Sequence, residues 1–155
     1  MGSPWLSKWR LICIGGLIAG TVDIGSACAI YRADPVVILQ AIAVGVLGRA
    51  SFGAGLPSAA LGLMLQWGMS IVIAYFCAVA DERIAYLRHR WVSAGLVYGT
   101  ITFFVMNYLV VPLSRVGKIP AFSIRWFVEN MLAMFLFGLI ITYVNGQSTP
   151  KTRGD

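Results

Sequence analysis

Two carboxylates lie inside long apolar stretches of the sequence, where they could hold or pass a proton. Asp23 interrupts the apolar run 11–31, and Glu129 lies inside the last apolar run of the chain. An ionisable group surrounded by hydrocarbon is costly and is by default a functional candidate. Two such groups at one depth could exchange a proton, with Arg49 and Arg125 as possible counter-charges.

Three amide side chains accompany these carboxylates within the apolar runs: Gln66, Asn107 and Asn130. With a helix rise of about 1.5 Å per residue, Asp23, Gln66, Asn107 and Glu129 lie about 16 to 22 Å from the expected cytoplasmic edge. Polar groups in hydrocarbon need partners. We therefore expect all five side chains to meet in one polar layer in the outer half of a helix bundle. The layer either fixes helix packing through hydrogen bonds or forms a route for protons or ions.

The sequence offers little for enzymatic chemistry. The single histidine, His89, lies in a charged segment, and no serine or cysteine has an evident base beside it. The three cysteines, Cys13, Cys28 and Cys77, fall in apolar runs without the clustered spacing of a metal site. We expect no catalytic residues, no enzyme activity, no metal and no cofactor.

The elements that carry these residues are apolar helices. Of the 155 residues, 59% are hydrophobic and 12% are charged, against about 25% charged in soluble domains. A bilayer core needs about 20 apolar residues of helix, and the run after Pro35 is too short to cross it. We predict an all-α integral membrane protein in which residues 1–155 form a single membrane domain. It has four transmembrane helices, at about 11–31, 58–80, 92–113 and 124–144, plus one short re-entrant or interfacial helix at about 35–48.

The net charge of +6 comes from short segments between the apolar runs. Membrane flanks explain this pattern better than nucleic-acid binding, so we expect lipids and no nucleic acid as partners. Four spans place both termini on one side, which then holds seven of the 12 Lys and Arg residues, so we expect cytoplasmic termini. On that side, basic residues expected to contact lipid head groups are Arg83, Arg88 and Arg90.

Two G-x-x-x-G motifs, Gly16 with Gly20 and Gly95 with Gly99, indicate close helix packing. With no catalytic set in view, these faces favour a non-enzymatic accessory or scaffold subunit that packs against other membrane-protein subunits. The alternative is a small channel or transporter for protons or a small solute that uses the intramembrane carboxylates.

Three strings resemble one known family: 38–43 (ILQAIA) with Gly45 and Gly48, 59–67 (AALGLMLQW) and 105–114 (VMNYLVVPLS). Together they are similar to the YagU-like family of small bacterial inner-membrane proteins. The resemblance implies four helices, a short helix after the first span and a bacterial cytoplasmic membrane location, and it implies no settled activity. The family leads us to expect histidine near Gln66 and Asn130, where this chain has amides. This departure favours a packing role.

Overall fold

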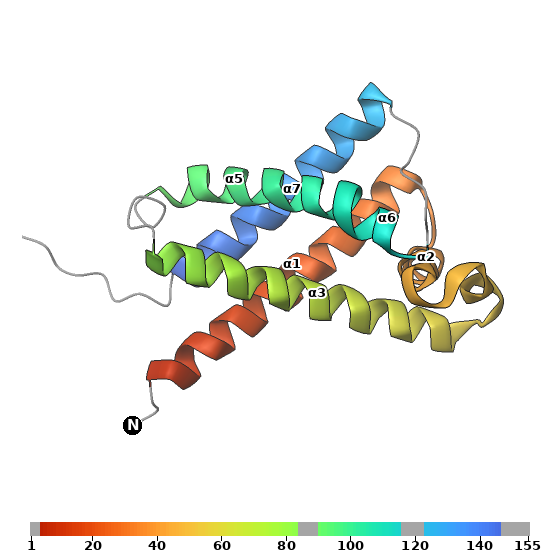
Figure 1. Cartoon of the computed structure of the whole chain (residues 1–155), viewed down its shortest axis with the longest axis horizontal. Coiled ribbons are helices and arrows are strands. Elements are labelled where there is room, and N and C mark those ends of the chain that lie inside the picture. The colour runs from red at the N-terminus through yellow and green to blue at the C-terminus, as the bar shows by residue number, and fades with distance from the viewer. Residues whose placement is uncertain (1–3, 84–89, 116–122, 147–155) are drawn as a thin grey trace, which may run out of the picture.

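The computed structural model describes residues 4–83, 90–115 and 123–146, which are almost entirely helical and contain no strand. The four long helices are α1, α3, the continuous helix formed by α5, η2 and α6, and α7 (Figure 1). The elements in chain order are α1 (Pro4–Tyr31), α2 (Pro35–Leu47), η1 (Gly48–Gly53), α3 (Leu56–Arg83), α5 (Trp91–Phe104), η2 (Val105–Val110), α6 (Val111–Leu113) and α7 (Ile124–Gly146).

Within the described ranges, five helical segments are long and apolar enough to cross a membrane, as expected of a multi-pass membrane protein. They are Lys8–Tyr31, Pro35–Gly53, Leu56–Asp81, Trp91–Leu113 and Ile124–Gly146. The four expected spans fall within α1, α3, α5 to α6, and α7, and the expected short helix falls on α2 and the start of η1. Length and composition alone therefore admit a fifth span where the sequence predicted a short helix.

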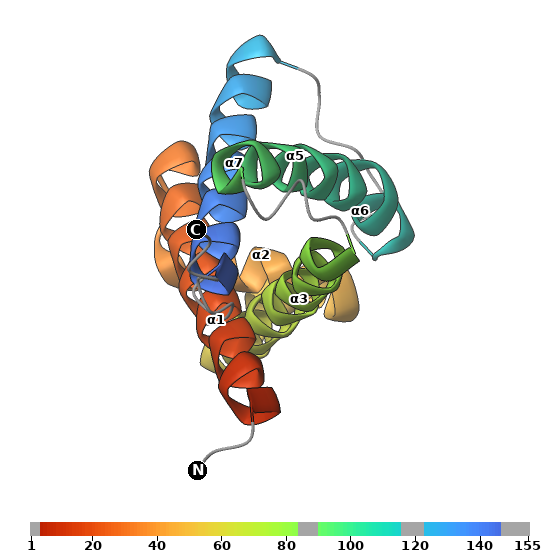
Figure 2. The same ribbon diagram turned by 90° about the vertical axis from the view of Figure 1, so that its left-hand side faces the viewer.

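The long helices pack in the order α5, α7, α1, α3, and α2 packs mainly on α3 and to a lesser extent on α1. Figures 1 and 2 show α1 and α7 inclined together, with α3 and α5 running in a different direction. Neighbours in this order are antiparallel. Along α1 and α3, Gly16 meets Ile71 and Asp23 meets Gln66; along α5 and α7, Gly95 meets Leu139 and Gly99 meets Met134. This order places residues from opposite ends of the sequence at the same depth.

Glycines bring the helices together at both of the G-x-x-x-G motifs. A β-carbon built on Gly16 would lie 2.7 Å from Ile71 Cα, and one on Gly20 would lie 2.6 Å from Ser70 Oγ. Real β-carbons do not approach backbone atoms so closely, so only glycine at position 16 permits this contact between α1 and α3, whereas the Ser70 hydroxyl opposite Gly20 can rotate. The first motif thus packs within the chain.

The second motif joins α5 to α7 in the same way. A β-carbon on Gly95 would lie 2.9 Å from Leu139 Cα, and one on Gly99 would overlap the Met134 carbonyl oxygen. Gly138 on α7 faces both, because its β-carbon would overlap the Gly95 carbonyl oxygen. Backbone therefore touches backbone along this interface, as small residues allow in membrane helices.

One cluster of buried apolar side chains occupies one half of the bundle. It combines the first half of α1, the second half of α3, the first half of α5 and the second half of α7. Its buried members are Ile12, Ala19, Ala74, Cys77, Ala78, Ala94, Tyr98, Phe137 and Ile141. We call this the closed half. In the other half, which we call the open half, Figures 1 and 2 both show the start of α7 standing apart from the start of α3.

The chain turns back on itself between α2 and α3. Gly48 adopts φ 69°, a left-handed conformation that suits glycine, and redirects the chain after α2. Ser51 then donates from Oγ to the Gln40 carbonyl at 2.7 Å, and Gln40 donates from Nε2 to the Gly55 carbonyl at 3.0 Å. The start of α3 therefore returns to the level of Gln40. In Figure 1, α2 is seen nearly end-on, so it crosses α3 rather than running beside it.

A π-helical segment, η2, interrupts the last long helix before Pro112. Proline lacks an N–H and its ring clashes with the carbonyl four residues earlier, here that of Tyr108. Wider π turns are one way in which a helix accommodates such a disruption. Asn107 lies inside this segment, which was not predicted from the sequence.

Candidate functional site

Asp23 and Gln66 form a polar contact that joins α1 to α3. Gln66 Nε2 on α3 donates to Asp23 Oδ2 on α1 at 2.7 Å. Asp23 follows Ile12, Gly16 and Ala19 at helical spacing, and these three are buried. Asp23 therefore continues the buried face of α1, at the depth where the closed half ends and its own side chain becomes partly exposed.

Polar groups beside this pair were not singled out from the sequence. Ser70 Oγ donates to the Gln66 carbonyl at 2.8 Å, and Trp67 Nε1 donates to Thr21 Oγ1 at 3.2 Å. Both contacts are at the interface that Gly20 opens between α1 and α3. The sequence signal was the one-turn offset of Ser70 from Gln66, which places both on one face of α3.

The other two amides bond to their own helices. Asn107 Nδ2 donates to the Phe103 carbonyl and Asn130 Nδ2 donates to the Trp126 carbonyl, both at 2.9 Å and both four residues back. Both side chains are partly exposed. Of the five residues expected in one layer, hydrogen bonds join only Asp23 and Gln66 within the described part of the chain.

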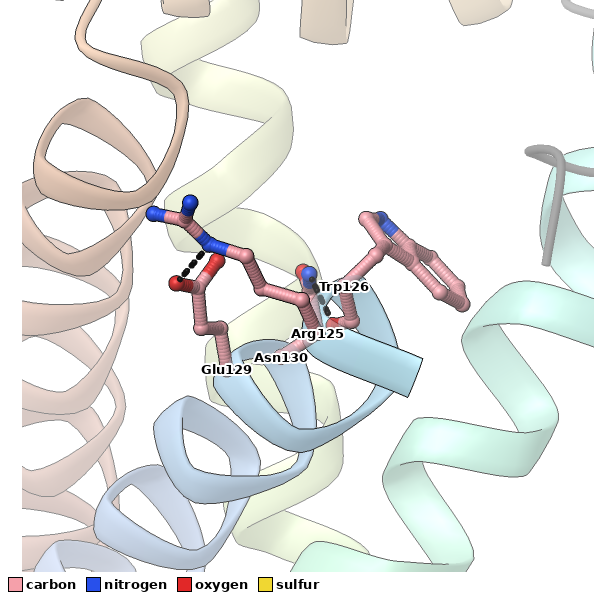
Figure 3. Close-up of polar contacts among 4 residues, drawn as sticks. All are labelled: Arg125, Trp126, Glu129 and Asn130. Atoms are coloured by element: carbon pink, nitrogen blue, oxygen red, sulfur yellow. Dashed lines mark hydrogen bonds and ion pairs between the residues drawn. The ribbon is translucent and has the colours of Figure 1, made fainter. Parts of the chain in front are cut away.

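Glu129 has a partner on its own helix, as Figure 3 shows. Arg125 Nε lies 2.8 Å from Glu129 Oε1, with the arginine side chain 73% exposed and the glutamate 33% exposed. On the other side of the helix, the Trp126 ring points away from this pair (Figure 3), and its Nε1 donates to the Tyr31 hydroxyl at 2.9 Å. Arg125 is thus the counter-charge of Glu129, and both belong to the first turns of α7.

The remaining arginines of interest lie near the ends of the apolar segments. Arg49 is exposed on η1 and forms no ion pair with any described residue, so it is not a counter-charge to Asp23 here. Arg83 ends α3 and Arg90 precedes α5, and both are exposed. Arg88 lies outside the described residues.

Another interhelical hydrogen bond ties α3 to α5 in the closed half. Tyr98 donates from its hydroxyl to Asp81 Oδ1 at 2.8 Å. The sequence placed Asp81 in a charged loop because Glu82 and Arg83 follow it, whereas α3 continues through all three residues. Asp81 therefore faces a neighbouring helix instead of solvent alone.

The arrangement supplies hydrogen bonds between and within helices. In the described ranges, no group of three His, Cys, Asp or Glu side chains is placed to hold a metal ion. The apolar helices define the class as an all-helical protein with multi-pass membrane character. No family model, curated protein or solved structure matches this chain. The YagU-like assignment accordingly stays a prediction from the sequence strings.

Proposed function

We propose that this chain is a non-enzymatic accessory or scaffold subunit of a membrane complex, with its partner covering the open half of the bundle. The observation that carries the proposal is the partial exposure of Asp23, Asn107 and Asn130 within apolar helices. Polar side chains that face lipid are costly. A partner helix laid against the open half would remove them from lipid and offer them further hydrogen bonds.

The glycine motifs support a revised partner surface. Gly16 and Gly20 contact α3, and Gly95 and Gly99 contact α7. Because these faces pack inside the chain, they stabilise the subunit itself. A partner would instead meet exposed side chains of the open half, such as Val128 and Leu132 on α7.

A transport path receives less support from the same contacts. Glu129 pairs with Arg125 on its own helix, while Asp23 bonds to Gln66. On the closed-half side of Asp23, the buried Ala19, Phe137 and Ile141 belong to the apolar cluster. Hydrogen bonds among the described residues do not connect the two carboxylates, so a proton would need water or a further group to pass between them.

For the topology, we propose four membrane spans and a re-entrant α2 in a bacterial cytoplasmic membrane, with cytoplasmic termini. The hydrogen bond from Ser51 to the Gln40 carbonyl, which returns the chain to the level of Gln40, supports the hypothesis that α2 is re-entrant. The resemblance to the YagU-like family and the excess of basic residues near the termini support the location and orientation.

Site-specific photo-crosslinking in the native membrane tests the proposed subunit. A photoreactive residue at Leu132, 60% exposed in the open half, should crosslink to one partner protein. The matched control is Phe76, which is 65% exposed on the part of α3 that enters the closed half and should not give that product. Free monomer in mild detergent, with no specific crosslink at Leu132, would contradict the proposal.

A flux measurement addresses the alternative. Proteoliposomes with a pH-sensitive dye should show no proton flux above empty liposomes under either sign of membrane potential. Flux that disappears in Asp23→Asn, a variant that keeps a hydrogen-bonding group opposite Gln66, would instead favour the transporter.

A further inference from the structure

The end of α6 meets the end of α2 and brings two arginines into one region. The Arg115 backbone N–H donates to the Gly45 carbonyl at 3.1 Å. A β-carbon on Gly45 would lie 3.7 Å from Ser114 Cβ, and one on Gly48 would lie 3.9 Å from Arg115 Cδ. The Arg115 side chain therefore runs past Gly48, the residue directly before Arg49.

The local backbone holds this juxtaposition. Gly48 has φ 69°, so the chain turns there and η1 begins. Ser51, three residues further on, is fully buried and bonded to the Gln40 carbonyl. Arg49 therefore projects from an anchored turn, while Arg115 is anchored to α2 by its own backbone.

Neither guanidinium has an acidic partner among the residues that the structure describes. Arg49 and Arg115 are both exposed, and neither side chain forms a hydrogen bond or an ion pair with a described residue. Arg125, by contrast, is held by Glu129 at 2.8 Å. Two neighbouring positive charges without an acid attract an anion, and the planar guanidinium fork suits a phosphate group.

Exposed apolar side chains flank both arginines. Leu113 is 79% exposed, two residues before Arg115, and Phe52 is 50% exposed, three residues after Arg49. The preceding turn of α2 adds exposed Val46 and Leu47. A ligand with a phosphate and hydrocarbon chains would satisfy both the charges and these side chains, whereas free phosphate would satisfy the charges alone.

We propose that Arg49 and Arg115 bind the phosphate of an anionic phospholipid, whose acyl chains lie against the apolar side chains around them. This lipid site lies on α6, α2 and η1, and its binding can be measured without the proposed partner subunit. Lipid bound there would also fasten α6 to the turn between α2 and η1.

Native mass spectrometry of the full chain in detergent tests the site. Phosphatidic acid should bind with an apparent affinity at least tenfold above that of phosphatidylcholine with the same chains. Arg49→Gln with Arg115→Gln should lower the affinity for phosphatidic acid at least tenfold. Arg10→Gln, which removes one exposed charge from α1 at the other end of the bundle, should change it less than twofold.

Two further measurements separate lipid binding from loss of folding and from binding of free phosphate. The variant Arg49→Lys with Arg115→Lys keeps both charges and should recover part of the binding, while circular dichroism should show unchanged helix content in every variant. Inorganic phosphate should not displace the lipid at equal concentration. Equal losses in Arg10→Gln and in the double glutamine variant, or efficient displacement by inorganic phosphate, would overturn the proposal.

Discussion

Asp23 and Gln66 share one short hydrogen bond between two helices that glycine holds close together. The value of this bond depends on what replaces it. Net gains from hydrogen bonds between membrane helices average about 0.6 kcal/mol. Leaving one buried polar group without its partner costs about 1–3 kcal/mol, which is larger than the gain from making the bond.

Gln66→Leu should therefore destabilise the protein by about 1–2 kcal/mol, because Asp23 loses its only described hydrogen-bond partner. The measurement is the unfolding midpoint in a denaturing detergent titration. The control is Asp23→Leu combined with Gln66→Leu, which removes both polar groups and should cost less than Gln66→Leu alone. A double variant that is less stable than the single variant would show that the bond is not the relevant interaction.

Glu129 illustrates the opposite case at the residue scale. Its partner Arg125 lies one turn away on the same helix, and the arginine is largely exposed. Exposed i,i+4 pairs stabilise helices by about 0.3–0.5 kcal/mol. The pair therefore neutralises a carboxylate near the start of α7 and contributes little to the packing of one helix on another.

At the scale of elements, the α5–α7 interface rests on backbone contact. Gly138 faces the backbone of both Gly95 and Gly99, so any side chain at position 138 must push the helices apart. Gly25 on α1 differs, because a β-carbon there would meet nothing within 4 Å. The two glycines thus provide a matched pair of sites on apolar helices.

Gly138→Ala should destabilise the fold by about 1–3 kcal/mol, as overpacking does in close-packed interfaces. Gly25→Ala should change the free energy of unfolding little or raise it by up to about 1 kcal/mol, because alanine favours the helix. The same detergent titration compares both variants. Equal stability of the two variants would mean that α5 and α7 do not approach as closely as these contacts require.

The sequence predicted the helices well because long apolar runs and their Pro and Gly boundaries are local features. Depth along the spans also placed Asp23 beside Gln66, since the two helices are adjacent and antiparallel. The depth of a residue along a span does not show which side of its helix faces a neighbour. The Asn107 and Asn130 side chains instead donate to backbone carbonyls of their own helices. Asp81 was missed because a charged cluster resembles a loop, although here α3 extends through it.

At the scale of the whole molecule, the number of spans depends on α2. Its 13 residues reach about 20 Å, short of the roughly 30 Å hydrocarbon core. The 19-residue segment Pro35–Gly53 is long enough only if η1 continues the direction of α2. The turn at Gly48 and the bond from Ser51 to Gln40 indicate that it does not.

A re-entrant α2 places Asp34 and Gly53 on the same side of the membrane, whereas a fifth span would separate them. Single cysteines at these two exposed positions, in a chain with Cys13, Cys28 and Cys77 replaced by alanine, should react with a membrane-impermeant maleimide from the same side of intact cells. Arg83→Cys, at the other end of α3, should react from the opposite side and serves as the control. Labelling of Asp34→Cys and Gly53→Cys from opposite sides would establish five spans, and it would place the two ends of the chain on different sides of the membrane.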